Sequence, residues 1–135
     1  GAPFMPLHPT KYAEMLSAKM KEADVKVWLI NTGWTGGAYG TGSRMKLKYT
    51  RAMITAALKG ELDSVEFVNH DVFGIAIPQS CPNVPNEILN PRNTWENPEL
   101  YDTKAIELAH KFEDNFAKFK EFANAEILAG APISQ

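Results

Sequence analysis

The chain of 135 residues has one cysteine, Cys81, and no long uninterrupted apolar run. A lone thiol can form neither an intrachain disulfide nor a Cys-x-x-Cys zinc site, and we expect Cys81 to be structural. Every apolar run is far shorter than the roughly 20 residues that a membrane helix requires. No signal-peptide pattern opens the sequence. These absences predict a cytoplasmic globular protein without membrane contact.

Patterns of metal ligands or catalytic residues are also missing. His8, His70 and His110 are far apart and share no ligand spacing. We expect His8 to order the start of a helix, His70 to lie in a hairpin turn and His110 to lie on the polar side of the last helix. The sequence therefore predicts no metal site and no catalytic residue.

Acidic residues are absent from a 36-residue stretch, residues 25–60, which contains six cations: Lys26, Arg44, Lys46, Lys48, Arg51 and Lys59. The rest of the chain carries eight cations and all sixteen acids, although the net charge is only −2. Positive charge is thus concentrated in one region of a nearly neutral chain. This distribution favours a small anionic ligand such as a phosphate compound over a long polyanion such as nucleic acid.

Five glycines lie within this region, at positions 33, 36, 37, 40 and 42. Glycine allows backbone N–H groups to approach a ligand closely, so the stretch indicates a ligand-binding loop. Two phosphate-binding motifs nevertheless fail. A P-loop requires Lys followed by Ser or Thr after the second glycine, but Ser43-Arg44 follows Gly42, and a dinucleotide fingerprint would need a third glycine at Met45.

Hydrophobic periodicity predicts alternating helices and strands in the first half of the chain. A helix is expected over Pro9–Ala23, followed by a strand over Val25–Ile30 with apolar residues on both faces, as in the centre of an α/β sheet. A short strand is predicted over Arg44–Lys48. Thr50 then caps a helix that runs to Leu58 and ends at Gly60.

The second half predicts two strands, Ser64–Val68 and Val72–Ile77, joined at residues 69–71. Five prolines, from Pro78 to Pro98 inclusive, predict an extended loop without regular elements. Asn97 then caps a long helix of roughly 37 Å that should lie across the outside of the sheet. The fold class is therefore α/β, with a mixed sheet flanked by helices and a long C-terminal helix.

Three strings of the sequence resemble ATP-dependent phosphoenolpyruvate carboxykinase. The most specific is NTGWTGGAYGTGSRMKLKYTRAM, residues 31–53, and it is flanked by GAPFMPLHPTKYAEML (residues 1–16) and VFGIAIPQSCPNVPNEILNPRNTW (residues 72–95). The likeness covers nearly the whole chain. Because proteins of that family are several times longer, residues 1–135 resemble only the C-terminal portion, a single fragment of the mononucleotide-binding domain.

The resemblance implies the gluconeogenic conversion of oxaloacetate and ATP to phosphoenolpyruvate, CO2 and ADP, with Mg²⁺ and Mn²⁺. The family's lysine-containing phosphate loop, its metal ligands and its oxaloacetate-binding arginines have no counterpart here. We therefore expect this chain to contribute to nucleotide binding within the complete enzyme, with the remainder of that chain as its partner, and to be inactive alone.

The resemblance also places three residues, Arg44, Met45 and Thr50, on the adenine side of the nucleotide. A planar guanidinium can stack on a purine, an apolar side chain can cover the ring, and a hydroxyl can bond to its edge. Ser43 departs from the lysine that many family members carry, so a phosphate contact is not expected there. The alternative hypothesis is an independent, non-catalytic nucleotide- or phosphate-binding module.

Overall fold

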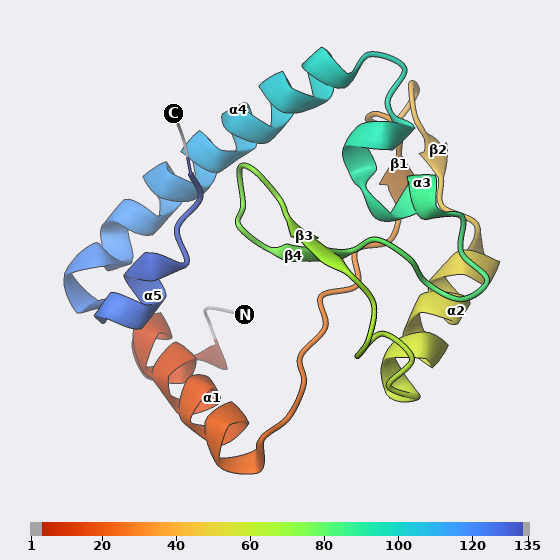
Figure 1. Ribbon diagram of the computed structural model, residues 1–135. Helices are drawn as coiled ribbons and strands as arrows, with labels where there is room; N and C mark the ends of the chain where they lie inside the picture. Colours follow the sequence, from red (N-terminus) through yellow and green to blue (C-terminus); the bar gives the residue numbers. More distant parts are fainter. Residues whose placement is uncertain (1–3, 134–135) are drawn as a thin grey trace.

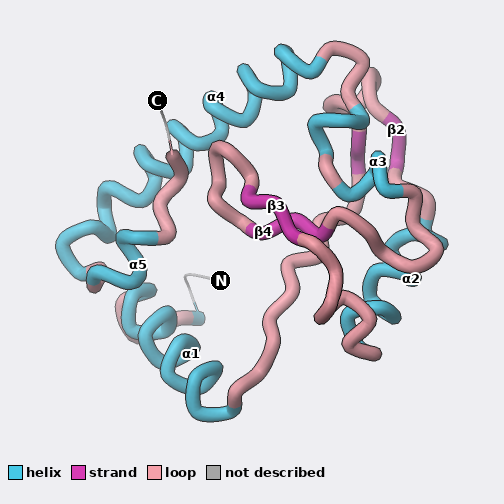
Figure 2. Tube along the Cα trace, in the orientation of Figure 1, coloured by secondary structure: helices cyan, strands magenta, loops and turns pink. Residues whose placement is uncertain are grey.

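The computed structural model describes residues 4–133, in which helices and two small antiparallel sheets form an α/β arrangement (Figures 1 and 2). The elements are, in order, α1 (Pro9–Ala23), β1 (Trp34–Thr35), β2 (Ser43–Arg44), α2 (Leu47–Leu58), β3 (Phe67–Asn69), β4 (Ala76–Pro78), α3 (Asn86–Leu89), the 3-10 helix η2 (Pro91–Thr94), α4 (Pro98–Phe116), the 3-10 helix η3 (Ala117–Phe122) and α5 (Ala125–Ala129). β1 pairs with β2 and β3 with β4. The predicted mixed sheet is wrong for these residues, since each sheet is a separate two-stranded ribbon.

Helix α1 has the bounds predicted from the sequence. The side chain of His8 caps it by accepting a hydrogen bond from the Thr10 amide, and Pro9 occupies the first turn. Asp24 ends the helix in the left-handed conformation, with φ of 46°. The helix is thus fixed by local capping groups at both ends.

The segment Val25–Ile30, predicted as a central strand, is not a strand. It connects α1 to β1 without regular structure (Figure 1), and within residues 4–133 the backbone of residues 26–32 forms no hydrogen bond with another backbone group. Leu29 is 83% exposed. The prediction failed because a strand requires neighbouring strands to receive its N–H and C=O groups. The apolar pattern is that of a buried strand, and Trp28 does pack near Phe67 of β3, with ring centroids 6.0 Å apart, but no strand of residues 4–133 pairs with the backbone of this segment.

Helix α2 begins earlier than predicted. Lys46 is its N-cap, so Thr50 lies inside the helix and does not cap it, and the preceding strand contains only Ser43–Arg44. Residues 47–49 are good to moderate helix formers, which lets the helix extend by one turn. The predicted end is confirmed: the Gly60 amide bonds to the Ala57 carbonyl and the Glu61 amide to the Ala56 carbonyl, the two bonds of a Schellman motif.

The hairpin expected in the second half is present, with shifted strands. β3 and β4 are three residues each, and residues 70–75 form the connection that was expected over residues 69–71. The next stretch, predicted as an irregular loop, contains α3 and η2. Proline was read there as a breaker, but Pro91 occupies the first turn of η2, where its fixed φ favours a helix start.

Helix α4 starts as predicted, with the Asn97 side chain accepting from the Glu99 amide and Pro98 in the first position. The α-helix ends at Phe116 and continues as the 3-10 helix η3, so it is not one long α-helix. It lies beside the connection of the β3–β4 hairpin and not across a sheet. Phe73 packs edge-on against Phe112, with ring centroids 6.2 Å apart. None of the described helices is long and apolar enough to cross a bilayer.

The core is small. Among the described residues the buried apolar side chains are Ala56, Leu62, Cys81, Val84, Ala105 and Ala109. Large apolar side chains elsewhere are open to solvent, including Leu58 at 84% exposure. The accessible surface is 10045 Å², whereas a folded monomer of 15.0 kDa is expected to expose about 7,000 Å². The described structure therefore leaves apolar faces uncovered.

Candidate functional site

The glycine loop, residues 33–44, is a closed hairpin that leads directly into α2. Its strands pair Trp34 with Arg44 and Thr35 with Ser43. At the tip, the Thr41 and Gly42 amides both bond to the Ala38 carbonyl, at 3.0 and 2.9 Å. The loop therefore has its own hydrogen-bond framework.

Packing explains two of the five glycines. A Cβ atom on Gly42 would lie 2.5 Å from the carbonyl oxygens of Thr35 and Gly37. Gly36 has φ of +76°, and a Cβ atom there would lie 2.7 Å from the Thr94 carbonyl oxygen. These glycines permit close backbone contacts within the protein, a role that requires no ligand.

Arg44 lies beside an aromatic side chain. Its guanidinium carbon is 6.0 Å from the ring centroid of Trp34, and Trp34 makes an edge contact with Tyr39, with centroids 5.1 Å apart. Arg44 is exposed and Trp34 is 45% exposed. The sequence alone did not reveal this pair. Hairpin register could have found it, because a closed hairpin pairs residues that are equidistant from its tip.

Met45 and Thr50 follow Arg44 along the chain and are both half-buried. The Met45 amide bonds to the Gly33 carbonyl at 2.7 Å, which ties the end of the loop to its start. Thr50 is the fourth residue of α2. No hydrogen bond or ring contact among the described residues joins the three side chains. The structure places them on one strand-to-helix stretch.

Residues 25–60 carry positive charge that is mostly not neutralised by nearby acids within residues 4–133. Lys26 forms an ion pair with Asp63, whereas the other five cations of residues 25–60 form no salt bridge with any described residue. The first turn of α2 contains no acid. Its free amide groups therefore add to the positive potential where Met45 meets the helix.

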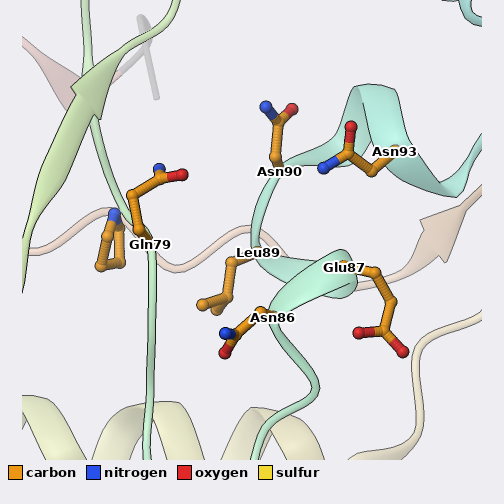
Figure 3. A pocket seen from close by; sticks show the side chains of 7 residues that line it. Gln79, Asn86, Glu87, Leu89, Asn90 and Asn93 are labelled. Atoms are coloured by element: carbon orange, nitrogen blue, oxygen red, sulfur yellow. The ribbon is translucent and has the colours of Figure 1, made fainter.

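A hollow in the surface lies elsewhere. A pocket of about 390 Å³ is bordered by Pro78, Gln79, Asn86, Glu87, Leu89, Asn90 and Asn93 (Figure 3). Its lining is dominated by carboxamides. Arg44, Met45 and Thr50 do not contribute to it.

The remaining residues of interest have structural contacts. His70 lies just after β3: its Nδ1 accepts from the Val72 and Phe73 amides, and its Nε2 is 2.7 Å from the Tyr101 hydroxyl. Cys81 is buried in the core, and burial, with a smaller contribution from Glu61, raises the pKa of its thiol. Within residues 4–133, no group of three or more His, Cys, Asp or Glu could hold a metal ion.

Comparison with known proteins assigns the family. The sequence profile described as phosphoenolpyruvate carboxykinase matches residues 1–87. The chain belongs to the phosphoenolpyruvate carboxykinase family. The protein named phosphoenolpyruvate carboxykinase (ATP) of Flavobacterium johnsoniae is 86% identical over 135 residues, all of this chain and 25% of that protein. Proteins of the same name from Christiangramia forsetii and Brevibacillus brevis are 64% identical over 133 residues and 58% over 131, covering 98% and 97% of this chain and 25% and 24% of theirs.

The chain thus spans about a quarter of the length of the carboxykinases it matches. This relationship accounts for two features of the described fold: the large exposed apolar area and the segment Val25–Ile30, whose backbone has no strand partner. Both are expected when a segment is separated from the longer chain that packs against it.

Proposed function

We propose that this chain is the C-terminal part of the nucleotide-binding domain of an ATP-dependent phosphoenolpyruvate carboxykinase. The complete enzyme would convert oxaloacetate and ATP to phosphoenolpyruvate, CO2 and ADP in the cytoplasm, as part of gluconeogenesis. Residues 1–135 would form one wall of its ATP site. The observation that carries this proposal is the 86% identity over all 135 residues to a quarter of a protein of that name.

In this proposal the chain contributes binding and no chemistry. The Arg44 guanidinium would stack on the adenine, Met45 would cover the ring and the Thr50 hydroxyl would bond to its edge. The exposure of Arg44 supports this role, since a side chain with one face on Trp34 can still present its other face to a ligand. The positive charge of residues 25–60 would draw the nucleotide toward the site.

The phosphate loop and the residues that hold Mg²⁺ and Mn²⁺ would belong to the rest of the enzyme. The described residues offer no cluster of metal ligands, so the metals would be held there. The alternative, an independent nucleotide- or phosphate-binding module, differs in that the whole site would lie within these residues. The mass of the protein in its source separates the two, because the proposal requires a polypeptide about four times longer.

The proposal is tested by Arg44→Ala in the complete enzyme. Loss of a partly desolvated cation–π contact should weaken ATP binding by ~1–2 kcal/mol, roughly ten-fold, with decarboxylation comparatively intact. Lys59→Ala is the matched control, because it removes one exposed cation of the same region at the other end of α2. A normal ATP affinity with an abolished chemical step would contradict the role of Arg44.

A further inference from the structure

A hydrogen-bond chain connects the glycine loop to a turn that lies far away in the sequence. Thr35 Oγ1 donates to Thr94 Oγ1 at 2.9 Å, and Thr94 Oγ1 donates to the Pro91 carbonyl at 2.7 Å. Both threonines are half-buried. The Thr94 hydroxyl therefore donates a hydrogen bond within η2 and accepts one from the glycine loop. One side chain thus holds the two segments together.

The backbones meet at the same place. Gly36, next to Thr35, approaches the Thr94 carbonyl so closely that a Cβ atom would lie 2.7 Å from its oxygen. Figure 1 shows the β1–β2 hairpin beside the α3–η2 segment, near the start of α4. A side-chain bond and a close backbone contact, made by adjacent residues, fix the position of β1 against η2.

The turn η2 is itself attached to a larger element. The Asn90 side chain accepts from the Arg92 amide, and Arg92 forms a two-bond ion pair with Asp102 of α4, at 2.8 and 2.9 Å. A bidentate pair restricts orientation as well as distance. The glycine loop is thus joined through η2 to helix α4.

We propose that Thr94 is a positioning residue for the nucleotide side of the site. Thr35 adjoins Trp34 and pairs with Ser43, which adjoins Arg44. Holding Thr35 against η2 therefore fixes the strand pair that brings Arg44 to the Trp34 ring. This inference rests on the function proposed above for Arg44, and it adds that the loop is held in place before ATP binds, which lowers the ordering cost of binding.

The test uses the complete enzyme with Thr94→Val, which removes both hydrogen bonds at nearly constant volume, and Thr94→Ser, which keeps the hydroxyl. Hydrogen exchange of peptides over residues 33–45 reports loop order, because the Thr41, Gly42 and Met45 amides are bonded within the loop. Thr94→Val should raise that exchange and increase the ATP dissociation constant roughly three- to ten-fold, with kcat little changed. Thr94→Ser should keep the loop exchange and the ATP dissociation constant close to those of the unaltered enzyme. Gly36→Ala should raise both, as Thr94→Val does.

Thr103→Val is the matched control. Its hydroxyl also bonds to a backbone carbonyl, that of Glu99, but on an exposed face of α4, and both readouts should stay at their normal values. Unchanged loop exchange in Thr94→Val overturns the positioning role. The positioning role is also overturned if Thr94→Val raises loop exchange but leaves the ATP affinity unchanged, while Arg44→Ala does weaken ATP binding. If Arg44→Ala also leaves the affinity unchanged, the proposed nucleotide role of Arg44 fails, and the positioning role of Thr94 fails with it.

Discussion

Arg44 and Trp34 face each other across the β1–β2 pair, with the guanidinium carbon 6.0 Å from the indole centroid. The contact restricts the arginine before any ligand is present. In the function proposed above, it would also bring the indole ring of Trp34 close to the adenine. Both effects concern affinity and orientation, and neither supplies a reacting group.

The first prediction is that the chain alone has no catalytic activity. We expect no phosphoenolpyruvate formation from oxaloacetate and ATP by the 135-residue protein, since a phosphate loop is missing from its sequence and its described residues hold no metal-ligand cluster. A coupled assay on purified protein measures this, with a mock purification as the control for contaminating full-length enzyme. Turnover above that control would contradict the assignment of the chemistry to the rest of the enzyme.

Nucleotide binding by the isolated chain should be weak. Micromolar affinity requires about −8 kcal/mol, whereas one stacked arginine, one hydroxyl contact and apolar cover supply about 3 kcal/mol. We expect a dissociation constant in the millimolar range or weaker, sensitive to salt and with little preference for ATP over tripolyphosphate. Titration calorimetry with both ligands at two salt concentrations measures this. Tight, salt-insensitive and adenine-selective binding would favour the independent module.

The Tyr101 hydroxyl should stabilise the connection of the β3–β4 hairpin. Two backbone amides donate to His70 Nδ1, so the ring proton is on Nε2 and is donated to Tyr101. Tyr101→Phe removes that acceptor, which should cost about 1 kcal/mol and raise local opening about five-fold. Hydrogen exchange of residues 70–75 measures the change. Tyr39→Phe is the control, because Tyr39 is 84% exposed, and an equal effect of both variants would refute the role of the bond.

Acid should affect α4 through Glu107. Hydrogen bonds from Lys104 and then Lys111 lower the pKa of Glu107 from 4.5 to about 2. Because the folded pKa is depressed, the stabilisation is present above the unfolded value near 4.5 and is lost as the pH falls toward 2.

A carboxyl-detected NMR titration measures the Glu107 pKa directly. The double variant Lys104→Gln and Lys111→Gln should return it toward its ordinary value. Lys118→Gln should leave it low, because Lys118 bonds to Asn115. An ordinary pKa in the unaltered protein would show that the two lysines do not hold the carboxylate in solution.

Local sequence was sufficient for the ends of several helices. His8 starts α1, Asn97 starts α4 and Gly60 ends α2, all as predicted, and α1 ends at Ala23 as predicted. Each of these signals acts through hydrogen bonds or backbone conformations within a few residues, so the sequence contains all that is needed. The string around the glycines was likewise sufficient for the family, and it led to Arg44, Met45 and Thr50 as candidate adenine contacts.

Contacts between distant segments were decided by the tertiary structure alone. Thr35 and Thr94 are 59 residues apart and His70 and Tyr101 are 31 apart, and no periodicity or motif relates them. Such pairs depend on how loops close and helices pack, which single-residue preferences do not specify. Val25–Ile30 is a second example of a feature that local sequence does not decide. Its sequence determined an apolar, extended segment, but whether that segment becomes a strand depends on a neighbour to share its hydrogen bonds.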